Sequence, residues 1–168
     1  MNSEADFIVI GSGIAGLNAA LTLADFGNVM VITKKNISDS STNFAQGGIA
    51  AVTNAKDSIM SHKKDTMTAG AFHNNKKAVE FLVSHGKTAI EQLITIGVPF
   101  EKKTTLEAAH SFPRILHATD ITGHEIEKAL VAKIRSIKNI TVLEDTYAID
   151  CIVKKNVCFG MQILKNKT

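Results

Sequence analysis

A glycine-rich turn near the N-terminus is the pattern with the clearest chemical meaning. Residues 11–16 read Gly-Ser-Gly-Ile-Ala-Gly and match the spacing GxGxxG. In this pattern the first glycine allows a tight turn, the second lets a diphosphate approach the backbone, and the third lets a helix lie close to a strand. Free N–H groups at the start of such a helix bind negative charge. The turn therefore predicts a dinucleotide site made by Gly11, Ser12, Gly13, Ile14, Ala15 and Gly16.

The residues around the turn predict the elements that position it. Residues 7–10 form a short apolar run, typical of a strand buried on both faces of a parallel sheet. Apolar and small residues recur with helical spacing over 14–23, and Gly27 is suited to a left-handed helix cap. A second buried strand is predicted at 29–32. This strand–helix–strand order predicts an α/β fold and gives the glycine pattern its weight.

A long polar loop follows the second predicted strand. Its hydroxyl, amide and backbone N–H groups suit the many hydrogen-bonding atoms of a flavin ring and its linker. The residues concerned are Ser41, Thr42, Asn43, Phe44, Ala45, Gln46, Gly47 and Gly48. A ribose-binding carboxylate is usual just after the second strand, but Thr33 and Lys34 stand there. On the residues alone, Lys34 leaves open NADP or a different arrangement of the adenosine half.

Four segments, GSGIAGL, ITK, STNFAQGGIA and HSFPRILHATDITG, occur in an order and spacing that resemble a known family. From Phe7 to about Leu164 the chain is similar to the FAD-binding domain of the fumarate reductase and succinate dehydrogenase flavoproteins. The resemblance implies a Rossmann-like FAD-binding fold of the glutathione-reductase type. It also implies FAD contacts at Lys34 and Ala148. Members with covalent flavin carry a His where this chain has Ser41, so the resemblance implies FAD held without a covalent bond.

Within this family, the resemblance is strongest to members that oxidise L-aspartate to iminoaspartate in de novo NAD (quinolinate) biosynthesis. It implies that Glu107 recognises the α-amino group of L-aspartate, and a carboxylate suits an ammonium group chemically. The neighbouring residues depart from the family pattern, because Leu106 replaces an Arg and Ala108-Ala109 replaces two glycines. These departures put substrate turnover in question more than FAD binding.

The length of 168 residues predicts a single domain. By resemblance it is a truncated FAD-binding domain, without capping and C-terminal helical domains and without catalytic residues, which lie further downstream in the family. Helices are predicted over 76–96, as two helices broken near Gly86, and over 124–136. Strand-like runs at 140–143, 148–153 and 157–164 predict a terminal β-meander. The sheet should therefore be incomplete at its C-terminal end, and association with itself or with a complementary chain is expected.

Three classes of function remain open: the FAD-binding part of an L-aspartate-oxidising enzyme, part of a fumarate reductase or succinate dehydrogenase type of flavoprotein, or a non-catalytic nucleotide-binding module. A net charge of +3 with dispersed lysines argues against nucleic acid. Glycines interrupt the apolar N-terminal segment, so no membrane span is expected. Cys151 and Cys158 predict buried free thiols in a reducing, cytoplasmic setting. No metal site is expected, because His110, His117 and His124 lack a usual ligand spacing.

Overall fold

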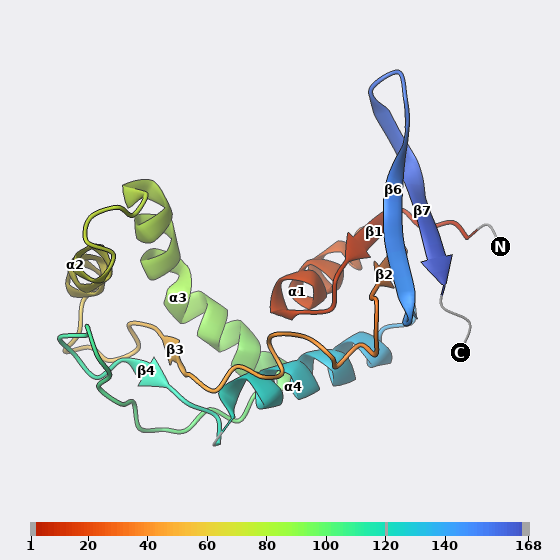
Figure 1. The fold of residues 1–168 in the computed structure, drawn as a ribbon. Coiled ribbons are helices and arrows are strands. Elements are labelled where there is room, and N and C mark those ends of the chain that lie inside the picture. The colour runs from red at the N-terminus through yellow and green to blue at the C-terminus, as the bar shows by residue number, and fades with distance from the viewer. Residues whose placement is uncertain (1–2, 120, 166–168) are drawn as a thin grey trace. The chain divides into compact units, whose positions relative to one another are not determined.

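The computed structural model describes residues 3–119 and 121–165. The described chain divides into two compact units: the described residues of Met1–Phe44 with Ile126–Thr168, and Ala45–Glu125. In chain order the elements are β1 (Phe7–Ile10), α1 (Ile14–Leu23), β2 (Val29–Ile32), β3 (Ile49–Ala50), α2 (Ile59–Ala69), α3 (Lys76–Ile96), β4 (Ile115–Leu116), α4 (Thr122–Ser136), β5 (Ile140–Leu143), β6 (Thr146–Lys154) and β7 (Val157–Lys165) (Figure 1).

A parallel sheet in the order β1-β2-β5 forms the centre of the first unit. Phe7 pairs with Val29, and Val29 pairs in turn with Ile140. All four residues of β2 are buried, and α1 packs against β1 and β2. The predicted strand–helix–strand unit and the α/β class are therefore confirmed.

The prediction that β1 is buried on both faces is wrong. Val9 is buried, but Ile8 is 40% and Ile10 57% exposed. Val9 points toward α1, since a side chain at Gly16 would lie 3.5 Å from its Cγ1. Successive strand residues point to opposite faces, so Ile8 and Ile10 point away from α1. On that side Ile8 lines a cavity of about 640 Å³ between the sheet and the β6–β7 hairpin.

The prediction for Gly27 is also wrong. Helix α1 ends at a cap residue, Ala24, that has an ordinary right-handed conformation, and Gly27 is not among the glycines with positive φ. A glycine at this position lets the chain pass close to Asp6, because an added Cβ would lie 2.6 Å from Oδ2 of Asp6. The same Oδ2 accepts a hydrogen bond of 2.7 Å from the N–H of Asn28.

The three C-terminal strands exist, but they do not form the predicted meander. β5 joins the parallel sheet beside β2, whereas β6 and β7 make a separate antiparallel hairpin. β5 can pair with β2 in the parallel direction because α4 precedes it, since parallel neighbours need a crossover connection that is usually a helix. Asp145, with φ 51°, then turns the chain into β6.

The second unit contains α2, α3 and the short β3–β4 ladder. The predicted break near Gly86 is wrong: α3 is one helix of 21 residues. Gly86 faces Ala51, where an added Cβ would meet the Ala51 Cβ at an ordinary 3.5 Å. The predicted end is confirmed, since Gly97 caps α3 with a left-handed φ of 110°. Two buried clusters support the unit: Ala51, Ile90 and Leu116 with Ile49 and Phe100, and Met67, Val79 and Val83.

Helix α2 was not predicted. Helix α4 begins two residues before its predicted start and buries Ile126, Leu130 and Ile134. Asp120 lies outside the described residues. Both cysteines are free and exposed, so the expectation of buried thiols is wrong. No helix in the described part of the chain is long and apolar enough to cross a membrane.

Candidate functional site

A cleft of about 440 Å³ lies in the first unit, at the carboxyl ends of β1 and β2. This volume is within the usual range for small-molecule sites, and this edge of a parallel sheet is where such ligands bind. The structure brings together here, from segments far apart in sequence, the predicted cofactor residues Gly11, Ser12, Gly13, Lys34, Ser41, Thr42 and Ala148.

The glycine turn has the geometry that its spacing predicts. Gly11 has φ 103°, a conformation that favours glycine. A Cβ on Gly16 would collide with the carbonyl oxygen of Gly11, so a glycine there lets α1 start directly above the turn. The buried hydroxyl of Ser12 hydrogen-bonds that of Thr33 at 3.1 Å, which ties the turn to the end of β2.

Thr42 connects the polar loop to the start of α1. Its Oγ1 accepts a hydrogen bond of 3.0 Å from the N–H of Ile14, and Gly13 is the cap residue with no side-chain cap of its own. The first N–H groups of a helix have no partner inside the helix and carry partial positive charge. A diphosphate group fits this donor set of backbone N–H groups, hydroxyls and the Lys34 ammonium.

The charges at the cleft leave it suited to an anion. Lys34 is exposed at its rim. Asp39 also lines the cleft, but its carboxylate is paired with the Lys35 ammonium at 2.9 Å. Hydrogen bonding to Asp39 and the attraction of its charge raise the pKa of Lys35, which stays protonated.

The rest of the predicted cofactor loop does not line this cleft. Ile14, Ala15 and Gly16 belong to α1, and Asn43 and Phe44 follow the lining residues Ser41 and Thr42. Residues 45–48 belong to the second unit. There the carbonyl of Ala45 accepts the N–H of Gly123 at 2.9 Å. Gly48 touches β4, since an added Cβ would lie 2.5 Å from Cγ2 of Ile115.

Glu107, the predicted substrate residue, is also in the second unit. Its Oε1 lies 2.9 Å from Nε2 of His117, and the same nitrogen is 3.0 Å from Oγ1 of Thr105. His117 immediately follows β4, whose Leu116 pairs with Ile49 of β3. The structure thus brings the Gln-Gly-Gly end of the polar loop and the Glu107 segment together through one small ladder.

Several cleft residues were missed by the sequence reasoning. Thr33, Ser40, Thr146 and Tyr147 also line the cleft. For Thr33 a signal was present, because it directly follows an apolar strand at the edge where ligands bind. The segment at 146–147 had none, since its place depends on how β6 crosses the end of the sheet.

One buried carboxyl group in the first unit has no ordinary partner. Glu127 of α4 is 1% exposed, and neither carboxylate oxygen has a hydrogen bond within normal geometry. Burial raises its pKa, and an interaction with the Ser40 side chain acts in the opposite direction. Among the described residues, no group of three or more His, Cys, Asp or Glu side chains is arranged to hold a metal ion.

The FAD binding domain family matches residues 6–168 of this sequence. L-aspartate oxidase 1 of Ralstonia nicotianae is 42% identical over 96% of this chain and 33% of its own length. The chloroplastic L-aspartate oxidase of Arabidopsis thaliana is 42% identical over 97% of this chain and 27% of its own length. The chain thus spans about a third of the length of the curated relatives it matches.

Solved flavoprotein structures share the fold. Mycobacterium smegmatis Sdh1 in complex with UQ1 superimposes with a TM-score of 0.87 and 30% identity, over 94% of this chain and 30% of that chain. E. coli quinol fumarate reductase FrdA gives a TM-score of 0.89 and 26% identity, over 95% of this chain and 29% of that chain. The architecture described above is therefore the FAD-binding fold of these flavoproteins.

Proposed function

Because the chain belongs to the FAD binding domain family, we propose that it is the FAD-binding part of an L-aspartate oxidase. The whole protein would oxidise L-aspartate to iminoaspartate in de novo NAD biosynthesis. The observation that carries this proposal is the 42% identity to L-aspartate oxidase 1 across 96% of the chain. Two further proposals follow: that residues 1–168 act as one FAD-binding domain within a longer protein, and that the protein works in the cytoplasm, since both cysteines are free.

The cleft supports a specific arrangement for FAD. The turn at Gly11–Gly16 and the start of α1 would hold the diphosphate, with Lys34 adding a positive charge at the rim. Ala148, which also lines the cleft, would face the adenosine half. Ser41 and Thr42, which line the same cleft, would hydrogen-bond the flavin end through their hydroxyl groups. For residues 43–48, flavin contacts rest on the resemblance alone.

The chemistry divides between the cofactor and the chain. When bound, FAD supplies the group that accepts a hydride from the substrate carbon. Glu107 would bind the α-ammonium group of L-aspartate, since a carboxylate forms strong hydrogen bonds with an ammonium. His117 holds this carboxylate at 2.9 Å and limits the positions that it can take.

The first test is FAD binding by the purified chain. After incubation with FAD and desalting, we expect a flavin absorbance spectrum to remain with the protein. Acid precipitation should then release the flavin into the supernatant, because Ser41 cannot form the histidine–flavin bond. Flavin left in the precipitate would contradict non-covalent binding, and absence of retained flavin would contradict an FAD site in this chain.

The likeness to Sdh1 and FrdA favours a second candidate, a dehydrogenase of the succinate and fumarate type. The two candidates differ in the substrate that reduces the flavin. In the whole protein, anaerobic addition of L-aspartate should bleach the flavin absorbance, whereas succinate should not. Bleaching by succinate alone would support the second candidate.

A further inference from the structure

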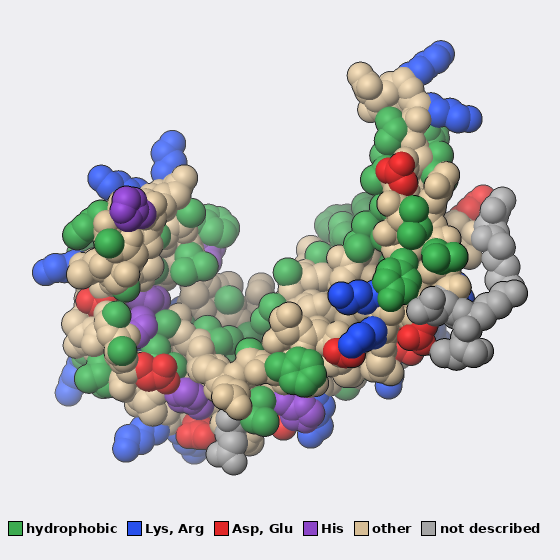
Figure 2. Space-filling model, in the orientation of Figure 1, with side chains coloured by type: hydrophobic (Ala, Val, Ile, Leu, Met, Phe, Trp, Pro, Cys, Tyr) green, Lys and Arg blue, Asp and Glu red, His purple; other side chains and the backbone are tan. Residues whose placement is uncertain are grey.

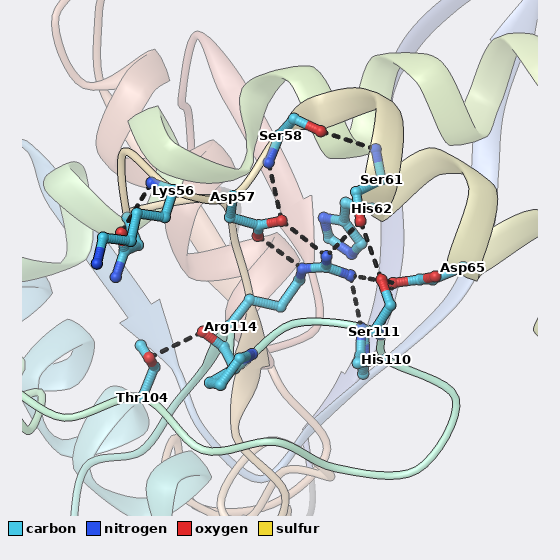
Figure 3. A network of polar contacts seen from close by, with 12 residues as sticks. Lys56, Asp57, Ser58, Ser61, His62, Asp65, Thr104, His110, Ser111 and Arg114 are labelled. Atoms are coloured by element: carbon cyan, nitrogen blue, oxygen red, sulfur yellow. Dashed lines mark hydrogen bonds and ion pairs between the residues drawn. The ribbon is translucent and has the colours of Figure 1, made fainter.

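Arg114 is the largest fully buried side chain of the described residues, with 1% of its area exposed. Its guanidinium has five N–H donors, and all five have partners (Figure 3). Nε and Nη2 donate to the two oxygens of Asp57, each at 2.8 Å. Nη1 donates to Asp65 at 2.6 Å and to Nδ1 of His110 at 3.1 Å, and Nη2 also donates to Ser61 at 3.1 Å.

Most acceptors of Arg114 come from α2 and the residue before its cap: Asp57 precedes α2, while Ser61 and Asp65 lie within it. The remaining acceptor, His110, lies four residues before Arg114. Asp65 Oδ2 also accepts the N–H and the hydroxyl of Ser111, both at 2.8 Å. Although burial raises the pKa of Asp65, the hydrogen bonds from Ser111 and Arg114 outweigh it and bring the pKa to about 2. The Asp65 carboxylate is therefore ionised at every physiological pH.

The segment that Arg114 fastens to α2 is the one that carries Glu107. Thr105 pairs with Ile115 by hydrogen bonds of 3.0 and 3.2 Å, and the hydroxyl of Thr104 donates to the carbonyl of Pro113 at 2.9 Å. These contacts close residues 105–115 into a loop. Glu107 lies in this loop, two residues after Thr105, with 47% of its side chain exposed.

We propose that Arg114 is a positioning residue for the substrate's amino end: by fixing the loop 105–115 on α2, it fixes where the Glu107 carboxylate is presented. The inference rests on the proposed function through the role of Glu107. A buried ion pair is weak evidence for a contribution to stability, because apolar residues of similar volume often serve as well. Arg114 instead contributes geometry. Because its planar guanidinium uses all five donors, it holds the loop in one orientation.

The first experiment tests the positioning itself on the purified chain. Arg114→Lys keeps the charge but loses the planar fork, so we expect amide hydrogen exchange over residues 104–113 to be about tenfold faster. Arg135→Lys is the matched control, because Arg135 is exposed and its ion pair with Glu144 is long, at 3.8 Å. Ser111→Ala, a milder change, should raise exchange about threefold. Unchanged exchange in both Arg114→Lys and Ser111→Ala would overturn the proposal.

The second experiment uses the whole protein and asks whether Arg114 acts through Glu107. We expect Arg114→Lys to raise KM for L-aspartate about tenfold while kcat stays within about twofold. In a Glu107→Gln background the same substitution should have no further effect on KM, because both substitutions remove the same interaction, that of Glu107 with the substrate.

The outcomes separate this inference from the proposed function. A wild-type protein that does not oxidise L-aspartate would overturn the proposed function, and the exchange experiment would still decide whether Arg114 fixes the loop. An active wild type with additive effects of the two substitutions would leave the function standing. It would overturn the inference, because a residue that only stabilises the fold would act independently of Glu107.

Discussion

Gly16 is the single residue on which the geometry of the phosphate turn depends most. A methyl group there would collide with the carbonyl of Gly11. We expect Gly16→Ala to lower the free energy of unfolding by about 1–3 kcal/mol, the usual range for overpacking. It should also reduce FAD retention, because α1 must move away from the turn. Circular dichroism during urea unfolding measures the first effect, and desalting with FAD measures the second.

Gly47→Ala provides the stability control for this prediction. An added Cβ at Gly47 meets nothing within 4 Å, and Gly47 is not among the positive-φ glycines. Its unfolding midpoint should match that of the wild type. If Gly16→Ala unfolds at the same urea concentration as Gly47→Ala, the close approach of α1 to the turn is not needed for the fold.

Thr42 gives a second prediction at the scale of one hydroxyl group. Thr42→Val removes the acceptor for the Ile14 N–H while keeping the shape of the side chain. Loss of one such hydrogen bond costs about 1 kcal/mol and releases the polar loop from the start of α1, so FAD, which contacts both, should bind roughly fivefold more weakly. Thr42→Ser keeps the hydroxyl and should bind like the wild type. Equal FAD dissociation constants for the Val and Ser variants, measured by flavin fluorescence, would contradict this role.

At the scale of elements, apolar patterns predicted most of the fold of the first unit. The runs at 7–10, 29–32 and 140–143 became β1, β2 and β5 because short runs rich in apolar and β-branched residues favour strands. Helix α2 gave no such signal, since only His62 and Met67 among its residues are buried. Its packing depends on Asp57 and Asp65 meeting an arginine about fifty residues later, which no local pattern reveals.

Gly86 shows why the predicted break in α3 did not occur, and it gives a test. Glycine in a helix interior weakens the helix but does not end it when both sides supply apolar burial. Gly86→Ala should therefore raise the free energy of unfolding by about 0.5–1 kcal/mol, because the added methyl group meets Ala51 at 3.5 Å. A lower urea midpoint for this variant would mean that α3 bends at this position.

His62 makes the packing of α2 sensitive to pH. It is 4% exposed, its Nδ1 has no hydrogen bond, and its ring lies 5.6 Å from that of His110. Burial, followed by the positive charge of Arg114, lowers the pKa of His62 from its ordinary value of 6.5. The unfolded chain therefore takes up a proton first, so stability is lost as pH falls below 6.5 toward the folded-state pKa.

The expected result is a lower urea midpoint at pH 5.5 than at pH 7.5 in the wild type, with a smaller difference in His62→Gln. His85→Gln is the matched control, because His85 is exposed on α3 and bonds the carbonyl of Phe81. It should keep the wild-type pH dependence. A pH dependence in His62→Gln equal to that of the wild type would show that protonation of His62 is not the cause.

At the scale of the whole molecule, spacing predicted the parts of the candidate site whose residues follow one another in the chain, and the resemblance added Lys34 and Ala148, which also line the cleft. The glycine turn and the start of the polar loop were found from spacing and resemblance, and they meet at one cleft. The contacts of Glu107 were not, because its partner His117 is ten positions away across an irregular loop. The Arg114 cluster was missed for the same reason, since it joins residues of α2 to a segment without periodicity.

The exposed apolar surface of the β6–β7 hairpin carries the last prediction. Green side chains cover much of the hairpin below the lysines at its tip (Figure 2). Ile149, Val157 and Phe159 are 59%, 53% and 68% exposed, and on the sheet side the hairpin borders the cavity lined by Ile8. Apolar surface of this kind favours association, so we expect the isolated chain to form dimers or larger species as its concentration rises.

Replacing Ile149 and Val157 together by Lys should return the chain to a monomer in sedimentation velocity measurements. The matched control replaces Phe26 and Phe81 by Lys, because these side chains are also exposed, at 76% and 67%, but belong to the turn after α1 and to α3 rather than to the hairpin. Both double variants add the same charge, so general repulsion affects them equally. A reducing agent removes cross-links through the exposed cysteines. If both variants dissociate to the same extent, charge rather than the hairpin surface controls association.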